Sequence, residues 1–310
     1  MQTAKVISVN ISEKKGTIKL PVKKIILDKS GVQNDAHSGM SLRQVSLLAK
    51  ESIESFAKTA KKHFVWGEFA ENITTEGIEL HTLGLLDRFK INDTELEVTQ
   101  IGKTCHGKGC AIFTEVGACI MPKEGIFARV IKEGSIIDGD DIEYIPKIFD
   151  VAVITLSDRA SIGEYPDKSG PRIIELLEEY FKTKNRKSNI TYFLIPDDET
   201  KLKQLIDDIL KSNPDIIITT GGTGIGSHDI TVDTIKLMID REIPGIMDMV
   251  RMKYGMENPA ALISRSVAGL MGETLVFTLP GSVKAVEEYM SEILKNLQHL
   301  LYMLHDLDSR

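Results

Sequence analysis

The sequence is poor in cysteine and in long apolar runs, and each shortage excludes a class of protein. Three cysteines among 310 residues do not make the disulfide framework of a small secreted protein. No stretch approaches the about 18 to 20 uninterrupted apolar residues of a membrane span, and residues 1–10 lack the apolar run of a secretory signal. We therefore expect a cytoplasmic protein that does not insert into membranes.

The chain also lacks an excess of basic residues. Its formal net charge is −7, and the first 148 residues carry equal numbers of basic and acidic side chains. Neither half has the basic surface that is typical of nucleic-acid-binding proteins. At about 150 residues per domain, the length predicts two domains.

The first domain, residues 1–147, is predicted to be a mostly β, barrel-like domain. Short β-type runs separated by Gly, Asn and Asp turns occupy residues 5–11, 22–27, 95–101 and 142–145. One helix is expected over residues 41–62. Strands without regular intervening helices favour antiparallel pairing.

The second domain, residues 148–310, is predicted to be an α/β domain with a mainly parallel sheet. The pattern predicts strands over residues 151–156, 191–195, 215–220 and 274–279, and helices over 170–184, 199–211 and 282–305. Such alternation is typical of βαβ units, whose sheet is covered on both faces. Ser169 is expected to be the N-cap of the first of these helices.

The most informative segment is a glycine loop, Gly221-Gly222-Thr223-Gly224, between a buried strand and a predicted helix. Glycines let backbone amides close on an anion, and a helix N-terminus adds a favourable dipole. The loop lacks both the Lys-Ser/Thr end of a P-loop and the later acidic residue of a dinucleotide-binding motif. We infer a phosphate site of another kind, with a plain tight turn as the alternative.

Small, hydroxyl or carboxylate residues also follow three other apolar runs. They are Ser157-Asp158 with Ser169 farther on, Asp197-Asp198 after Pro196, and Pro280-Gly281-Ser282. Each alone is more often a cap or a turn. Because ligands of open α/β sheets bind at the carboxyl ends of strands, the set together predicts a ligand site at one edge of the sheet.

These blocks, followed in order by Ala261-Leu-Ile-Ser-Arg-Ser266, resemble the MoaB/Mog-type molybdopterin adenylyltransferase family over about residues 149–305. The resemblance implies a nucleotidyltransferase that uses ATP and Mg²⁺ to adenylylate molybdopterin and releases pyrophosphate. The acidic positions of the family fall on Asp197 and Asp229, which would be catalytic and would hold Mg²⁺. Its cofactor-binding positions fall on Ser157, Asp158, Ser169, Gly221, Gly222, Thr223, Gly224, Ser264, Pro280, Gly281 and Ser282.

Both acidic positions also have an ordinary structural interpretation. Asp229 could be the N-cap of a helix that begins near Thr231, and Asp197 and Asp198 could belong to a solvated turn. The resemblance further implies a homotrimer or larger assembly, and partner proteins that insert molybdenum or receive the cofactor.

Two positions depart from that family. His228 stands where its members commonly have Arg, and Val232 where they often have Pro. Arg is a permanent bidentate phosphate donor and a neutral His is not, so phosphate binding is weakened if that Arg contributes. The alternative function is therefore a non-catalytic protein that binds, stores or delivers the molybdenum cofactor.

All three cysteines of the chain lie between residues 105 and 119. The potential zinc ligands are Cys105, His106, Cys110 and Cys119. A zinc site is disfavoured, because no C-x-x-C pair occurs and Cys105 and His106 are adjacent. Cys105 has His106, Lys103 and Lys108 nearby, whose positive charge would favour a reactive thiolate.

Four blocks of the first domain resemble the MOSC domain, the sulfurase C-terminal module of molybdenum cofactor biology, over about residues 4–145. They are Asp35-Ala-His37-Ser-Gly39, Arg43-Gln-Val-Ser-Leu47, Gly67-Glu-Phe-Ala-Glu-Asn72 and Met121-Pro-Lys-Glu-Gly-Ile-Phe-Ala-Arg-Val130. The resemblance implies a functional cysteine that handles sulfur or contacts the cofactor, at Cys105 with Cys119 as the alternative. It also implies a polar pocket of His37, Arg43 and Asn72, and pyridoxal phosphate binding as a weaker association.

Overall fold

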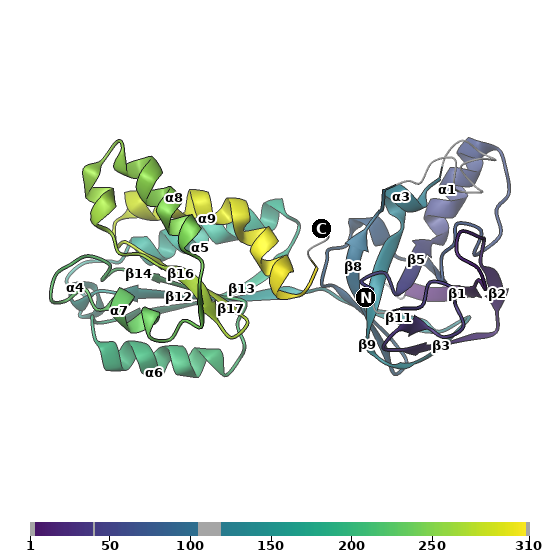
Figure 1. Cartoon of the computed structure of the whole chain (residues 1–310), viewed down its shortest axis with the longest axis horizontal. Coiled ribbons are helices and arrows are strands. Elements are labelled where there is room, and N and C mark those ends of the chain that lie inside the picture. The colour runs from purple at the N-terminus through teal and green to yellow at the C-terminus, as the bar shows by residue number, and fades with distance from the viewer. Residues whose placement is uncertain (1–3, 40, 105–118, 308–310) are drawn as a thin grey trace. The chain divides into compact units, whose positions relative to one another are not determined.

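The computed structural model describes residues 4–39, 41–104 and 119–307. The chain divides into two compact units, Met1–Lys147 and Ile148–Arg310 (Figure 1). Among the residues that the structure describes, no helix combines the length and the apolar character that crossing a membrane requires.

Seven strands of the first unit close into a barrel. The strands of this unit are β1 (Ala4–Ile11), β2 (Leu20–Val22), β3 (Lys24–Asp28), β4 (Gly31–Val32), β5 (Val45–Ala49), β6 (Ile73–Glu76), β7 (Arg88–Ile91), β8 (Thr94–Ile101), β9 (Ile126–Lys132), β10 (Gly134–Ile137) and β11 (Asp141–Ile145). The order β11-β7-β8-β9-β5-β6-β1 is closed by pairing of β1 with β11, while β10-β3-β4 form a small second sheet. Of the barrel pairings described, only β5–β6 is parallel, which confirms the predicted barrel.

The helix expected over residues 41–62 is only partly present. Val45–Ala49 form β5, and α1 covers Lys50–Ala60. Every residue of β5 is buried, and the strand pairs with β6 on one side and with β9 on the other. Pairing inside the barrel therefore overrides the helical propensity of this Leu- and Ala-rich segment. The shorter elements of the unit are η1 (Leu80–Thr82) and α3 (Met121–Glu124).

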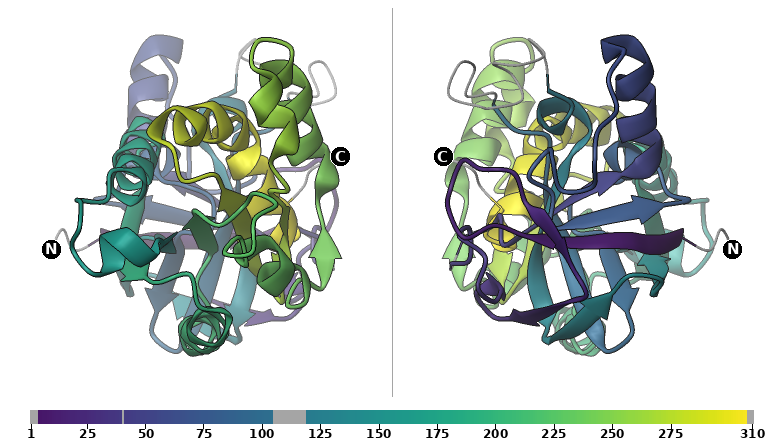
Figure 2. Two further views of the ribbon diagram at one scale, coloured as in Figure 1. Left: turned by 90° about the vertical axis from the view of Figure 1, so that its left-hand side faces the viewer. Right: turned by 90° about the vertical axis from the view of Figure 1, so that its right-hand side faces the viewer.

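The second unit is a six-stranded sheet with helices on both faces (Figures 1 and 2). Its strands are β12 (Ile148–Leu156), β13 (Lys187–Ile195), β14 (Ile216–Thr220), β15 (Arg241–Glu242), β16 (Ala268–Met271) and β17 (Thr274–Leu279). The order is β13-β12-β14-β17-β16-β15, in which the first four strands are parallel and the last two are antiparallel to their neighbours. The predicted strands are all present, although β13 begins at Lys187.

The helices of this unit form two layers. They are α4 (Asp158–Ser161), α5 (Ser169–Thr183), α6 (Glu199–Leu210), α7 (Thr231–Lys236), α8 (Pro244–Gly255), η3 (Pro259–Ile263) and α9 (Val283–Leu304). α6 and α7 lie on one face of the sheet, and α5, α8 and α9 on the other (Figure 1). β14 and β17 have no exposed residue, as expected of strands that are covered on both faces.

Ser169 is not the N-cap of α5, contrary to expectation. Lys168 occupies the N-cap position, and Ser169 is already helical. The carboxylate of Asp167 accepts the amides of Ser169 and Gly170 instead, at 2.9 and 3.0 Å. A carboxylate two residues before the helix thus takes the capping role that the serine hydroxyl was predicted to fill.

Candidate active site

The four segments predicted to meet at one edge of the sheet do meet there. The amide of Ser157 donates to the Ile195 carbonyl at 2.9 Å, which joins the ends of β12 and β13. The amide of Gly221 donates to the Leu279 carbonyl at 3.0 Å, which joins the ends of β14 and β17. Parallel strands place their carboxyl ends together, and these two bonds fix the loops against one another.

Glycine is required at the start of the glycine loop. Gly221 has φ +100°, and a Cβ there would collide with the carbonyl oxygen of Leu156 at the end of β12. Gly222 has φ +62°, and its Cβ would collide with Thr231 and lie 3.4 Å from an oxygen of Asp197. Only glycine lets this backbone pass so close to the neighbouring strand and carboxylate.

Asp158 and Asp197 face each other across the ends of β12 and β13. The amide of Asp158 donates to Asp197 Oδ2, and the amide of Asp197 donates to Asp158 Oδ1, both at 3.0 Å. Burial, together with the negative charges of Asp158 and Asp229, raises the pKa of Asp197. His228 Nδ1 lies 3.7 Å from Asp158 Oδ2 on an exposed side chain, so the residue that departs from the family reaches this carboxylate pair.

Asp229 stabilises the glycine loop from within. Its Oδ2 accepts the amide of Gly226 at 2.8 Å, and it would lie 2.7 Å from a Cβ on Gly224. The N-cap of α7 is Ile230, so the interpretation of Asp229 as a helix cap is wrong. α7 has only six residues and so does not offer the dipole of a long helix. The backbone amides of the loop would therefore be the groups that bind an anion here.

Several predicted site residues serve as caps or lie buried. Ser157, Asp198 and Ser282 are the N-caps of α4, α6 and α9. Asp198 accepts a hydrogen bond from the amide of Lys201 at 3.0 Å. It therefore caps a helix and is not simply part of a solvated turn. Ser169 is buried, with its hydroxyl on Asp167. Pro280 and Gly281 do line the loop: the Pro280 carbonyl accepts Thr220 Oγ1, and a Cβ on Gly281 would approach Gly221.

Arg265 belongs to this site, although the sequence did not single it out. Its Nε donates to the Gly224 carbonyl at 2.8 Å, and its Nη2 donates to the Asp229 carbonyl at 3.0 Å. Both Nη atoms also bind the carboxylate of Asp233, at 2.8 and 2.9 Å. The only sequence signal was its position in the Ser-Arg-Ser block, which does not reveal that it reaches the glycine loop.

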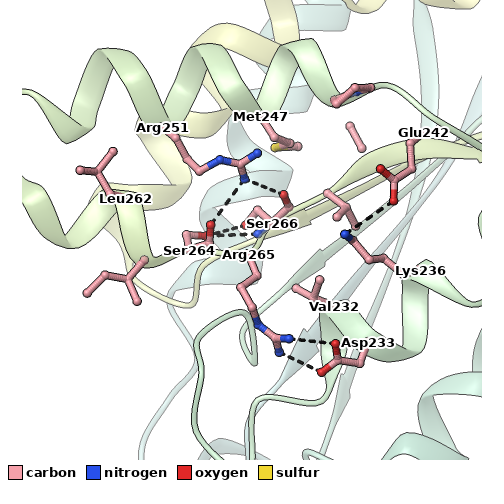
Figure 3. Close-up of a pocket in the computed structure, with 14 residues that line it drawn as sticks. Val232, Asp233, Lys236, Glu242, Met247, Arg251, Leu262, Ser264, Arg265 and Ser266 are labelled. Atoms are coloured by element: carbon pink, nitrogen blue, oxygen red, sulfur yellow. Dashed lines mark hydrogen bonds and ion pairs between the residues drawn. The ribbon is translucent and has the colours of Figure 1, made fainter.

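A cavity of about 370 Å³ is lined by Arg265 and by residues of α7 and α8 (Figure 3). Ser264 lies in its wall, where its hydroxyl is 2.9 Å from that of Ser266. Arg251 donates to the carbonyls of Ser264 and Ser266, at 3.4 and 3.0 Å. Val232, the second departure from the family, is buried and also lines this cavity.

The acidic groups fit a metal that arrives with a phosphate ligand. The described residues include no group of three or more His, Cys, Asp or Glu side chains that could hold a metal ion on their own. Mg²⁺, however, is commonly held by one or two carboxylates together with substrate phosphates and water. Burial is the main cause of the raised pKa of Asp197, and the repulsion from Asp158 and Asp229 that adds to it would be offset by such a cation.

In the first unit, Asp35 connects two of the three predicted pocket residues. Its Oδ1 accepts the amide of His37 at 2.9 Å, and its Oδ2 accepts Lys19 Nζ at 2.5 Å and Asn72 Nδ2 at 3.3 Å. Although burial opposes ionisation, hydrogen bonds from His37 and Lys19 lower the pKa of Asp35. Lys19 is buried, and nothing in its sequence context distinguished it from a surface lysine.

Asn72, predicted to line a polar pocket, hydrogen-bonds within the first unit. It is buried, and its Oδ1 accepts the amide and hydroxyl of Ser46, so it joins β5 to the segment before β6. Arg43 is exposed and donates to Gln100 at 2.6 Å. Arg43 and Lys103 lie 5.5 and 5.9 Å from the centre of the Phe127 ring, which places two cations at one aromatic side chain.

Cys119 is half-buried and packs beside a phenylalanine-rich cluster that includes Phe64, Phe69 and Phe127. Cys105, the predicted functional cysteine, lies outside the described residues, as do His106, Lys108 and Cys110. The structure therefore describes the cationic residues around Phe127. The prediction of Cys105 as the functional cysteine rests on the sequence alone.

Comparison with known proteins agrees with both resemblances. Residues 152–299 match the model of the probable molybdopterin binding domain, and residues 34–143 match the MOSC domain. The molybdopterin adenylyltransferase of Pyrococcus furiosus is 37% identical over 161 residues, which are 50% of this chain and 91% of that protein. The chain belongs to the MoaB/Mog family. Its first unit is a MOSC domain.

Other members of the MoaB/Mog family match over a similar length. Molybdenum cofactor biosynthesis protein B of Bacillus cereus is 34% identical over 164 residues, which are 52% of this chain and 93% of that protein. The crystal structure of the tungsten cofactor synthesizing protein MoaB from Pyrococcus furiosus shares 36% identity and has a TM-score of 0.46; the match covers 51% of this chain and 98% of that one. We call residues 148–310 the MoaB/Mog unit and residues 1–147 the MOSC unit.

Proposed function

We propose that the MoaB/Mog unit adenylylates molybdopterin with ATP and Mg²⁺ in molybdenum cofactor biosynthesis. The observation that carries the proposal is the meeting of the glycine loop with Asp197 and Asp229 at the carboxyl edge of the sheet. Loop amides suit phosphate groups, and two carboxylates suit a phosphate-bound cation. The name of the Pyrococcus furiosus relative supports the same reaction.

The reaction needs positioning and charge compensation more than proton transfer. An oxygen of the terminal phosphate of molybdopterin forms a bond to the α-phosphorus of ATP, and the bond from that phosphorus to the bridging oxygen breaks, releasing pyrophosphate. The attacking phosphate is already ionised at pH 7, so the step requires no strong general base. Catalysis then depends on aligning the two phosphates and offsetting their charge.

Each part of the site has a role in that step. The backbone of Gly221 to Gly224 would lie against the phosphates, and Asp197 and Asp229 would hold Mg²⁺. When bound, Mg²⁺ supplies positive charge to the phosphate oxygens. The Asp158–Asp197 hydrogen bonds fix the loops that carry these groups. His228 reaches Asp158 from the loop and would approach the phosphates with a weaker donor than the family arginine.

Pyrophosphate release tests this proposal directly. The intact protein, incubated with ATP, Mg²⁺ and purified molybdopterin, should release pyrophosphate, and the release should stop when molybdopterin is omitted or the metal is chelated. Stoichiometric binding of molybdopterin with no pyrophosphate would instead support the second candidate, a protein that stores or delivers the cofactor. The His228 substitution is the feature that favours this second candidate.

For the MOSC unit we propose handling of sulfur or of the finished cofactor through Cys105. Arg43 and Lys103 bring two positive charges to Phe127, and Lys103 stands two residues before Cys105 in the sequence, so this charge would suit an anionic ligand. Pyridoxal phosphate binding is a weaker proposal from the same family resemblance. Proteins that insert molybdenum or receive the cofactor would then be the partners of the chain, in the cytoplasm.

We also propose that the chain assembles as a homotrimer or a larger oligomer through the MoaB/Mog unit. Three methionines at or after α8, Met249, Met252 and Met256, are 51%, 70% and 89% exposed, more apolar surface than a solvated helix usually presents. Light scattering should give a mass about three times 34.4 kDa or a multiple of that value. A monomer mass would contradict the assembly.

A further inference from the structure

Arg265 connects three parts of the MoaB/Mog unit with one side chain. Its guanidinium donates to the carbonyl at each end of the loop segment from Gly224 to Asp229, and it also pairs with Asp233 on α7. The amide of Arg265 donates to the Thr223 carbonyl at 3.0 Å, so its main chain is anchored to the same loop. The Asp233 pair is visible in Figure 3.

The two carbonyl contacts distinguish this arginine from an ordinary ion pair. Arg172 also bonds two groups, Glu175 and Glu287, but both are flexible carboxylate side chains. The side chains of Arg172 and Arg265 are each 35% exposed, so solvent screens the two comparably. Arg265 instead binds backbone, and a planar guanidinium holds such acceptors in a fixed geometry that a lysine cannot reproduce.

Apart from Arg265, the loop segment has few contacts outside itself, among them the 3.7 Å approach of His228 Nδ1 to Asp158 Oδ2. Ile225, Gly226, Ser227 and His228 are all exposed. Within it, the amide of Asp229 donates to the Gly226 carbonyl at 3.1 Å, and Asp229 Oδ2 accepts the Gly226 amide. A segment of this kind opens easily unless its ends are fixed. The guanidinium fixes both ends, and one of those ends is the backbone of Asp229.

We propose that Arg265 is a positioning residue that holds the glycine loop closed so that the Asp229 carboxylate stands in place for adenylyl transfer. Arg265 acts through its contacts to the loop backbone and to Asp233, and it does not contact the reacting atoms. The inference rests on the proposed function for its catalytic consequence. Its structural content, a loop whose order depends on one guanidinium, is measurable without any turnover.

The test compares Arg265→Lys and Arg265→Met with the matched control Arg172→Lys in the full-length protein. Hydrogen–deuterium exchange of residues 221–230 should become at least tenfold faster in both Arg265 variants, with exchange in β14 and β17 unchanged. kcat/KM for pyrophosphate release should fall at least tenfold in both, because lysine keeps the charge but cannot span two carbonyls and a carboxylate. Asp233→Asn, which weakens the same contacts from the α7 side, should give an intermediate increase in loop exchange.

Three results would overturn the inference. The first is loop exchange in Arg265→Lys that is no faster than in Arg172→Lys. The second is faster loop exchange in the Arg265 variants with full turnover. The third is faster exchange across the whole MoaB/Mog unit, which would mean general destabilisation. If the unsubstituted protein releases no pyrophosphate, the proposed function fails. The exchange data then still decide whether Arg265 orders the loop. Should the Arg265 variants not fold, Asp233→Asn decides in their place.

Discussion

Asp158 and Asp197 hold each other through reciprocal hydrogen bonds, in which the amide of each donates to the carboxylate of the other at 3.0 Å. The bonds lock the loop after β12 to the loop after β13. They also bring two negative charges together, and Asp229 adds a third nearby. Burial, and after it these negative charges, raise the pKa of Asp197. Negative charge concentrated at the proposed phosphate site would be balanced by a divalent cation that binds with the phosphates.

We predict that Asp229→Asn reduces pyrophosphate release by about 100-fold or more, since a carboxylate–metal contact contributes several kcal/mol in the transition state. The fold should survive, because the asparagine oxygen can still accept the Gly226 amide. Asp207→Asn, on the exposed side of α6, is the control and should have full activity. Full turnover in Asp229→Asn would remove this carboxylate from the mechanism.

The neighbouring carboxylates Asp197 and Asp198 should behave differently. Asp198 follows Asp197 directly in the sequence, but the structure places it as the N-cap of α6. Asp197→Asn should therefore lose most activity with little change in stability. Asp198→Ala should keep activity and lose about 1 kcal/mol of unfolding free energy, the usual cost of a missing cap. Thermal melts and pyrophosphate assays on both variants test these two roles. Loss of activity in Asp198→Ala with full activity in Asp197→Asn would mean that the roles are reversed.

The sequence predicted the sheet edge well because its evidence is local. Strand β17 was predicted over its full length, and the positions of Gly221 and Asp197 followed from the rule that parallel strands end together. The residues that were missed depend on contacts between distant parts of the chain. Arg265 reaches a loop about 40 positions earlier, and Lys19 is buried by pairing with Asp35, which no local pattern reveals. β5 was mistaken for helix for the same reason, since its partners β6 and β9 lie far along the chain.

A buried carboxyl group should make the stability of the MOSC unit depend on pH. Burial raises the pKa of Glu71 to about 7, although Gly67 and Thr74 donate hydrogen bonds to it. The folded state therefore binds this proton more tightly than the unfolded state. The free energy of unfolding that this proton contributes is fully present below the unfolded pKa of about 4.5. This contribution, on the order of 2 to 3 kcal/mol, is lost as the pH rises toward about 7.

Glu71→Gln should remove that dependence, because the amide does not ionise and its oxygen can still accept the Gly67 amide. Denaturant unfolding can be followed by the fluorescence of Trp66, the single tryptophan of the chain. Between pH 5 and pH 8, the free energy of unfolding should change less with pH in the variant than in the parent protein. Glu13→Gln, at an exposed position, is the control. Parallel pH profiles for the parent and Glu71→Gln would refute the assignment.

The two units should fold independently. Each has its own core, one inside the barrel of the MOSC unit and one between the sheet and α6 and α7 of the MoaB/Mog unit. We expect fragments 1–147 and 148–310 to be soluble and to unfold cooperatively at midpoints within a few degrees of those in the whole chain. Aggregation of either fragment, or loss of its cooperative transition, would show that the units depend on each other.

Cys105 should be the most reactive of the three thiols. His106, Lys103 and Lys108 are close to Cys105 in the sequence and would supply positive charge that stabilises a thiolate. Cys110 precedes Ala-Ile-Phe in the sequence, and Cys119 packs beside the phenylalanine-rich cluster. A limiting amount of an alkylating reagent at neutral pH should label Cys105 first, as peptide mass spectrometry would show. Cys105→Ser should impair the sulfur or cofactor handling of the MOSC unit while pyrophosphate release by the MoaB/Mog unit stays unchanged. First labelling of Cys119, or a stoichiometric zinc ion that protects all three thiols together, would overturn the assignment.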